Sequence, residues 1–301
     1  MLKNLYGLIR YHWIRRMRKV FPQSRGNIRF FLEYKFRKNM GIEIDLDNPK
    51  TFNEKIEWLK FNYHNPLLTK CADKVMAREY IKDTVGEKYL VESLGAWDSA
   101  DDIDFDALPE QFVLKVNHGC KQNIIHRSGP VDVKKYRRKL NMWLSPNRNH
   151  YFQSFEWQYK NIKPKILGET YVKEMDDSTG EYEFFCLSGN PEFILLRDYA
   201  RGRRNLNYLD KDYKKMPFYR RYKNSDNIPP KPKELKEMLS ICKKLAKPFP
   251  LVRINIIKTS DGLKVNELTF TPGNGYDAFV PNKYDLYFGK MIKLPKPIIE
   301  K

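Results

Sequence analysis

The eight residues Phe112-Val113-Leu114-Lys115-Val116-Asn117-His118-Gly119 hold the most informative pattern in this sequence of 301 residues. The first five are apolar apart from Lys115, which predicts a short, largely buried strand. Asn123-Ile124-Ile125 begins another strand, so residues 117–122 form a tight connection between the two. A strand lysine followed by a glycine-containing loop can place an ammonium group and backbone N–H groups against phosphate oxygens. An edge-strand lysine that reaches out to water has the same pattern.

Helices and strands alternate on both sides of this motif. Thr51-Phe52-Asn53-Glu54 reads as a capping box that opens a helix, because the hydroxyl and the carboxylate can satisfy each other's backbone donors. Further helices are expected over 66–82, 133–144 and 232–246, and strands over 165–172, 181–187, 191–197, 251–257 and 263–268. Glycine-containing turns at 180, 188–190 and 260–262 indicate hairpins in the second half of the chain. The sequence therefore predicts an α+β fold with more than one lobe.

The last predicted hairpin carries polar side chains at alternate positions. Arg253 and Asn255 share one face of their strand, and Glu267 and Thr269 share one face of the next. If the two strands pair, these groups converge as a Mg²⁺ with bound phosphates would require; the polar outer face of an ordinary hairpin would look the same. The following loop, Thr271-Pro272-Gly273-Asn274-Gly275, has glycines that permit close approach of the backbone to a ligand.

Taken in order, these segments resemble the ATP-grasp superfamily, and within it the TupA-like family, which is typified by teichuronopeptide-biosynthesis proteins of surface-polysaccharide gene clusters. The resemblance covers about residues 50–295. It rests on five ordered motifs, at residues 51–60 (TFNEKIEWLK), 72–74 (ADK), 112–119 (FVLKVNHG), 157–164 (WQYKNIKP) and 267–273 (ELTFTPG).

The resemblance implies an ATP-grasp fold, in which two α+β lobes hold a nucleotide between them, with an extra basic helix at the N-terminus. It divides the chain into a helical extension (1–50), an N-terminal subdomain (51–110), a central subdomain with the phosphate loop (111–172) and a C-terminal subdomain with the metal site (173–301). The implied cofactors are ATP and Mg²⁺.

The resemblance also assigns roles to individual residues. Lys74 and Lys115 would contact the ATP phosphates, and Glu169, Thr170, Tyr171 and Val172 would form the adenine hinge. Arg253, with Lys115, would face the transferring phosphoryl group. Its last assignment places Glu267, Asn255 and Thr269 at Mg²⁺. The residues themselves, apart from the resemblance, suggest His118, Gly119 and Lys121 in the phosphate loop, and Arg201, Arg203, Arg204, Gly273, Asn274 and Gly275 at the substrate.

These roles imply a ligase that joins a carboxylate to an amine in the synthesis of a bacterial capsule, O-antigen or teichuronopeptide-like polymer. The sequence departs from the family pattern at three places: Cys120-Lys121-Gln122 replaces a small glycine-rich run, Glu181 and Glu183 replace an acid and a lysine, and Asn255 replaces an Asp. A glycosyltransferase or other group transferase on the same fold, and a non-catalytic nucleotide- or glycan-binding descendant, are the alternatives. GxSxG, HExxH and P-loop motifs are absent, which excludes the commonest hydrolases, zinc proteases and P-loop enzymes.

Positive charge is concentrated in two stretches. The chain has 56 Lys and Arg against 37 Asp and Glu, a formal charge of +19. Residues 1–40 hold +10 and residues 201–223 hold +7, which leaves about +2 for the other 238 residues. Such local charge, without a zinc finger or an RNP-like run, argues against nucleic acid as a partner. The stretch 201–223 suits an anionic saccharide or a lipid-linked polysaccharide precursor, or is simply a solvated loop.

Residues 1–21 have apolar residues at helical spacing with arginines between them, which predicts a basic amphipathic helix ending near Pro22. Such a helix either makes peripheral contact with the anionic inner leaflet or docks on the body of the protein. With no long apolar window and no signal peptide, we expect a cytoplasmic protein, free or peripheral at the membrane face. The widely spaced Cys71, Cys120, Cys186 and Cys242 are expected to be reduced and mostly buried.

Overall fold

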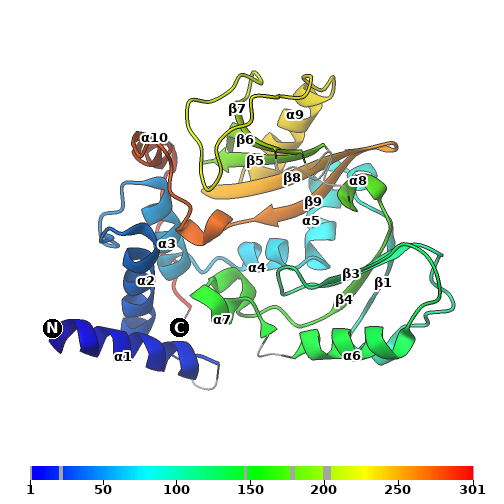
Figure 1. Ribbon diagram of the computed structural model, residues 1–301, viewed down its shortest axis with the longest axis horizontal. Coiled ribbons are helices and arrows are strands. Elements are labelled where there is room, and N and C mark those ends of the chain that lie inside the picture. Colours follow the sequence, from blue (N-terminus) through cyan, green and yellow to red (C-terminus); the bar gives the residue numbers. More distant parts are fainter. Residues whose placement is uncertain (1, 20–22, 146–147, 177–179, 199–204, 301) are drawn as a thin grey trace.

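Two antiparallel β-sheets form the frame of the computed structural model (Figure 1). The structure describes residues 2–19, 23–145, 148–176, 180–198 and 205–300. A four-stranded sheet has the order β1-β4-β2-β3, and a five-stranded sheet has the order β7-β6-β5-β8-β9. The strands are β1 (Ser93–Trp97), β2 (Phe112–Val116), β3 (Asn123–His126), β4 (Ile166–Thr170), β5 (Glu181–Leu187), β6 (Asn190–Asp198), β7 (Asn205–Asp210), β8 (Leu251–Thr259) and β9 (Gly262–Thr269).

Helices cover the outer faces of both sheets. In Figure 1, α9 lies on the outer face of the five-stranded sheet and α6 on the outer face of the four-stranded sheet, while α4 lies between α3 and α5. The helices are α1 (Leu2–Met17), α2 (Arg25–Met40), α3 (Phe52–Asn62), α4 (Pro66–Ala72), α5 (Met76–Val85), α6 (Val133–Leu144), α7 (Tyr151–Ser154), α8 (Lys173–Asp176), α9 (Leu235–Ala246) and α10 (Lys283–Met291). This arrangement confirms the predicted α+β class.

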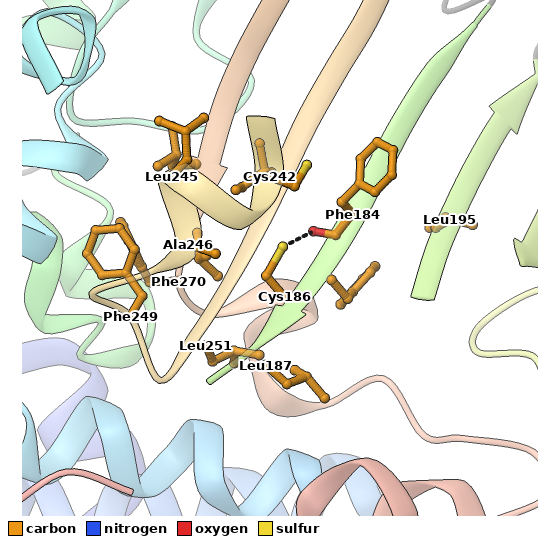
Figure 2. Close-up of a cluster of buried hydrophobic side chains, with 14 of the residues drawn as sticks. Phe184, Cys186, Leu187, Leu195, Cys242, Leu245, Ala246, Phe249, Leu251 and Phe270 are labelled. Atoms are coloured by element: carbon orange, nitrogen blue, oxygen red, sulfur yellow. Dashed lines mark hydrogen bonds between the residues drawn. The ribbon is translucent and has the colours of Figure 1, made fainter. Parts of the chain in front are cut away.

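Side-chain alternation along the strands separates the core from the space between the sheets. On β5, Phe184 and Cys186 turn toward α9, where Figure 2 shows them near Cys242 and Leu245. All four cysteines are free thiols, and three of them are buried, as predicted; Cys120 is exposed. The alternate residues Glu181, Glu183 and Phe185 therefore face away from α9.

Several elements differ from the sequence prediction. The helix expected over 66–82 is broken into α4 and α5, because Asp73 leaves the helix and its carboxylate accepts from the backbone N–H of Val75 (2.8 Å), at the start of α5. Strands β1 and β7 and helices α2 and α10 were not expected. The capping box at Thr51 is present, with Thr51 and Glu54 bonded to each other's backbone.

The N-terminal helix α1 packs one face on the body. Ile14 is fully buried, and the ring of Tyr11 stacks on Phe31 of α2 at 5.1 Å between centroids. Phe31 in turn meets Phe155 edge-on at 5.0 Å. Each such buried side chain contributes on the order of 2 kcal/mol, so α1 is held firmly. In the part of the chain that the structure describes, no helix is both long and apolar enough to cross a bilayer.

Candidate active site

A pocket lies between the two sheets and is lined from both. Nine of the residues selected from the sequence line it: Lys74, Lys115, Gly119, Lys121, Glu169, Thr170, Tyr171, Val172 and Glu267. Six further lining residues were not selected: Val113, Gln122, Asn123, Ile125, Met175 and Asn266. Alternation along β2 already placed Val113 on the face of Lys115, so that apolar wall could have been predicted.

Lys74 reaches the pocket from the break between α4 and α5. The Asp73 carboxylate that caps α5 also accepts from the side-chain amide of Asn117 (2.9 Å), which ties the break to the loop after β2. Lys74 Nζ then donates to the carbonyl oxygen of Gly119 (2.8 Å). Burial lowers the pKa of Lys74, and the nearby ammonium of Lys115 lowers it further. An anion bound beside Lys74 would therefore be strongly favoured.

Lys115 faces the pocket and not bulk water. Its neighbours on β2, Leu114 and Val116, are fully buried on the opposite face, in the cluster that includes Leu140 of α6. Lys115 Nζ lies 2.7 Å from Oε2 of Glu169, and Arg78 Nη1 lies 2.8 Å from Oε1 of the same carboxylate. Glu169 thus orients Lys115 and also ties the end of β4 to Arg78 of α5.

The loop after β2 can accept a phosphate. A Cβ at Gly119 would lie 1.7 Å from Oε1 of Gln122, so the glycine leaves room that the Gln122 amide now fills. That Oε1 atom is buried and has no hydrogen-bond partner in the described part of the chain. Because the two ends of an amide are nearly isosteric, rotation would present Nε2 as a donor to an anion. These residues therefore fit a nucleotide phosphate, with Lys74 and Lys115 beside it.

His118, another residue predicted for this loop, is turned into the interior. Its side chain is fully buried and does not line the pocket; its Nδ1 lies 3.3 Å from Oδ1 of Asn117. The contact of His118 with phosphate, expected from the sequence, therefore stays a prediction, and the observed partner of its ring is Asn117. His126 is likewise buried, with its ring bonded to the Tyr136 hydroxyl (3.1 Å).

Across the pocket, the predicted hairpin pairs Arg253 with Thr269 and Asn255 with Glu267. Arg253 Nε donates to Asn255 Oδ1 (3.1 Å), and its Nη2 donates to Thr269 Oγ1 (2.9 Å). Asn255 Nδ2 donates in turn to Glu181 (2.9 Å). The side-chain oxygens of two predicted metal ligands, Asn255 and Thr269, are therefore occupied by Arg253, whereas the half-buried carboxylate of Glu267 lines the pocket.

The fit to Mg²⁺ depends on Glu267. In the described ranges no group of three or more His, Cys, Asp or Glu side chains could hold a metal ion. Mg²⁺ is commonly bound by one or two carboxylates together with substrate phosphates, so a single carboxylate suffices when a nucleotide is present.

A β-bulge opposite Asn255 and Ile256 leaves Asn266 without a paired residue, and Asn266 lines the pocket beside Glu267. Strand alternation alone would not have placed Asn266 there.

A buried carboxylate that the sequence did not assign holds Arg253 in place. Glu183 Oε2 lies 3.4 Å from Arg253 Nη1, and Glu183 Oε1 lies 2.5 Å from Arg197 Nε. Burial alone would lower the pKa of Arg253, but the carboxylates of Glu183 and Glu267 raise it above its ordinary value. Two guanidinium groups thus flank one carboxylate, near the edge of the pocket marked by Glu267.

The predicted substrate residues lie elsewhere. Gly273, Asn274 and Gly275 form a short 3₁₀ turn with positive φ, outside the lining of this pocket. Lys60 Nζ donates to both the backbone oxygen (2.7 Å) and Oδ1 (2.8 Å) of Asn274, and a Cβ at Gly275 would lie 2.6 Å from Oε1 of Glu57. These contacts fix the turn on α3. Arg201, Arg203 and Arg204 lie outside the described residues.

A family model and several solved structures match the chain. The model of the family described as TupA-like ATPgrasp matches residues 54–293. No curated protein matches the sequence. Among solved structures, D-alanine–D-alanine ligase from Helicobacter pylori is 14% identical, with 81% of this chain and 69% of that chain covered and a TM-score of 0.44.

Two further solved structures match the chain. The same ligase from Bacillus anthracis is 15% identical, with coverages of 72% and 64% and a TM-score of 0.42. N5-carboxyaminoimidazole ribonucleotide synthetase, solved as an ADP complex, is 11% identical, with coverages of 82% and 57% and a TM-score of 0.44. This chain therefore spans less than two thirds of the length of these last two proteins.

Proposed function

Because the chain belongs to the TupA-like ATP-grasp family, we propose that it is an ATP- and Mg²⁺-dependent ligase that joins a carboxylate to an amine. One observation carries the proposal: Lys74 and Lys115 from one side of the pocket and Glu267 from the other line the same space. Two cations opposite one carboxylate suit the phosphates of a nucleotide with its metal ion.

Each part of the pocket has a task in this reaction. When bound, ATP supplies the phosphoryl group that activates a carboxylate, and Mg²⁺ neutralises phosphate charge. Lys74 and Lys115 hold the phosphates, and the apolar walls from Val113 and Ile125 enclose the base against the hinge 169–172. Arg253, kept cationic by Glu183 and Glu267, stabilises the negative charge that develops at the transferred group. No protein nucleophile is required.

We further propose that the substrate is an anionic saccharide or a lipid-linked polysaccharide precursor of a bacterial capsule, O-antigen or teichuronopeptide-like polymer. Arg197 supports this, since it lies beside Arg253 on the shared carboxylate of Glu183 and precedes the basic sequence 201–204. A uronic acid carboxylate placed against these two guanidinium groups would be both bound and oriented for activation.

Calorimetry of Mg²⁺-ATP binding tests the nucleotide site. We expect Lys115→Met to raise Kd by roughly 10- to 100-fold, because a hydrogen bond to a charged group contributes about 1.5–3 kcal/mol. Lys236→Met, on the exposed face of α9, is the matched control and should leave Kd unchanged. Absence of binding by the wild type at millimolar nucleotide would contradict the proposal.

A nucleotide-sugar transferase is the second candidate. Two observations favour it: the Gln122 amide occupies the space over Gly119, and Asn255 brings no charge to the metal side of the pocket. Transfer from a UDP- or CMP-sugar without ATP consumption would support this candidate over the ligase. Activity that is unchanged in Glu267→Ala would instead indicate that Glu267 has no part in turnover, as in a non-catalytic descendant that binds a nucleotide or a glycan.

A further inference from the structure

The outer side of α1 exposes large apolar side chains. Tyr6, Ile9 and Trp13 follow the i, i+3, i+7 spacing of one helical stripe, and 66%, 59% and 50% of their respective surfaces are exposed. On the opposite face of the helix, Tyr11 and Ile14 are buried against α2. Packing on the body therefore accounts for only one face of α1, and the outer stripe has no partner within the described residues.

Helix α1 and the residues after it also carry exposed cations. Arg15, Arg16 and Lys19 are exposed, and none of them has a carboxylate partner among the described residues. The first 32 residues of the sequence contain no Asp or Glu. The combination of an aromatic and aliphatic stripe with unpaired arginines differs from an ordinary solvated helix face, where isolated apolar residues are surrounded by charges of both signs.

Helix α6 adds a second basic surface. It has five Lys and Arg in 12 residues and no acidic residue. Four of the five are exposed, as is Met142 (47%): these cations are Lys134, Lys135, Arg138 and Lys139. In the sequence the acidic stretch 98–106 offsets this charge. In the structure that stretch contacts one side of α6, where Asp101 lies 3.9 Å from Arg137 and accepts from Asn141 (3.1 Å), and among the described residues the four exposed cations do not pair with it.

The two helices lie along the same edge of the molecule. In Figure 1 both run along the lower border, on the side opposite α9. The end of α1 is tied to the segment that follows α6, since Arg18 donates to the backbone oxygen of Phe152 in α7. Lys35 of α2 donates to the neighbouring Gln153 oxygen (2.9 Å), which reinforces the connection.

We propose that this edge, formed by the outward side chains of α1 and α6 and called here the basic face, docks on the surface of an anionic lipid bilayer. Each Lys or Arg close to an anionic surface strengthens binding about fivefold. Trp13, Tyr6 and Ile9 would enter the headgroup region, where Trp and Tyr side chains are preferred. Nucleic acid explains the cations alone and leaves the exposed apolar stripe without a role. The proposal does not depend on the ligase reaction.

Vesicle co-sedimentation of the full-length protein tests the basic face. We expect firm binding to vesicles of phosphatidylcholine with 30% phosphatidylglycerol and at least tenfold weaker binding to pure phosphatidylcholine. Replacing the four exposed cations of α6 by glutamine should weaken binding to the anionic vesicles by tenfold or more. The substituted residues are Lys134, Lys135, Arg138 and Lys139.

A matched control removes the same charge from the far side of the molecule. Four exposed lysines at α9, on the opposite edge in Figure 1, are replaced by glutamine and should leave at least half of the affinity: Lys236, Lys243, Lys244 and Lys247. The pair Ile9→Ser and Trp13→Ser keeps the charge and should still weaken vesicle binding severalfold.

Three results would overturn the proposal. Equal loss in the α9 control would show that only net charge matters. Equal binding to neutral and anionic vesicles would remove the role of the cations. Binding to duplex DNA that is tighter than to anionic vesicles, and unaffected by Ile9→Ser and Trp13→Ser, would assign the face to nucleic acid. Thermal melting of each variant shows whether a loss of binding is caused by unfolding. Because ATP is absent throughout, the result does not depend on whether the ligase proposal is correct.

Discussion

Glu156 should control the acid stability of the protein. Its side chain is buried and accepts from His150 Nε2 (2.8 Å), Ser154 Oγ (3.1 Å) and Asn274 Nδ2 (3.3 Å). Burial alone would raise its pKa, but the charge and hydrogen bond of His150, with Lys60, lower the pKa of Glu156 from its ordinary value of 4.5 to about 2. A carboxylate whose folded pKa is depressed stabilises the fold above pH 4.5, and this contribution is lost as the pH falls toward 2.

The size of the effect follows from the shift. About 2.5 pH units at about 1.4 kcal/mol each correspond to roughly 3 kcal/mol of the free energy of unfolding. We expect the wild type to lose this amount between pH 4.5 and 2 in excess of Glu156→Gln, which has no proton to gain. Glu110→Gln, at an exposed carboxylate, should keep the wild-type pH profile.

Urea unfolding at a series of pH values measures the difference. The slope with pH is the readout, because the substitution also lowers stability at neutral pH by breaking hydrogen bonds. Glu57 should have the opposite pH dependence. Burial raises the pKa of Glu57 to about 6, so protonation of this carboxylate increases the free energy of unfolding as the pH falls from 6 to 4.5. If Glu156→Gln and the wild type lose stability in parallel below pH 4.5, the reasoning about this network is wrong.

Two other substitutions test packing and the site. Gly289→Ala would place a Cβ 2.2 Å from the backbone oxygen of Lys50 and should lower the free energy of unfolding, measured in urea, by at least about 3 kcal/mol. Gly26→Ala is the control: its Cβ would have nothing within 4 Å, so the substitution should be neutral or stabilise α2 by up to about 1 kcal/mol. Equal effects of the two substitutions would contradict the packing of α10 on residues 50–51. Arg253→Lys should lower turnover about tenfold or more and leave the Kd for Mg²⁺-ATP within about twofold. The reason is that lysine lacks the planar guanidinium group whose two N–H donors contact Asn255 and Thr269. A larger change in Kd than in turnover would assign Arg253 to nucleotide binding.

Elements with a strong local signal could be predicted from the sequence, and those defined by tertiary contacts could not. The Thr51 capping box, the 133–144 helix and the 181–187 strand have the expected bounds because capping and apolar periodicity are local. β1 (Ser93–Trp97) contains a glycine and forms by pairing with β4, which lies about 70 residues further along the chain. The break between α4 and α5 depends on Asp73 meeting Asn117, a contact that helical periodicity cannot show.

The same distinction applies to the candidate site. Lys74, Lys115 and Glu267 were selected from motifs, and the structure brings them to one pocket. The ion pairs of Glu183 with Arg253 and Arg197 could not be predicted from the sequence, because they depend on strand order: β5 lies between β6 and β8. Asn266 enters through a bulge, and His118 turns inward although the next residue lines the pocket. Motif spacing identifies the residues of a loop, but the backbone decides which of them face the ligand.

Two departures from the family pattern are neighbours in space and are best understood together. Asn255 pairs with Glu183 across β8 and β5, and its amide donates to Glu181. Burial raises the pKa of Glu181, and the adjacent Glu183 raises it further. An aspartate at position 255 would add a third carboxylate to this buried group, where like charges are strongly destabilising. The amide instead donates one hydrogen bond and accepts another from Arg253, so Glu181, Glu183 and Arg253 all keep a partner. The acidic charge of this wall therefore lies on β5, where it orients the arginines, and Glu267 is the carboxylate of the β8–β9 hairpin that lines the pocket.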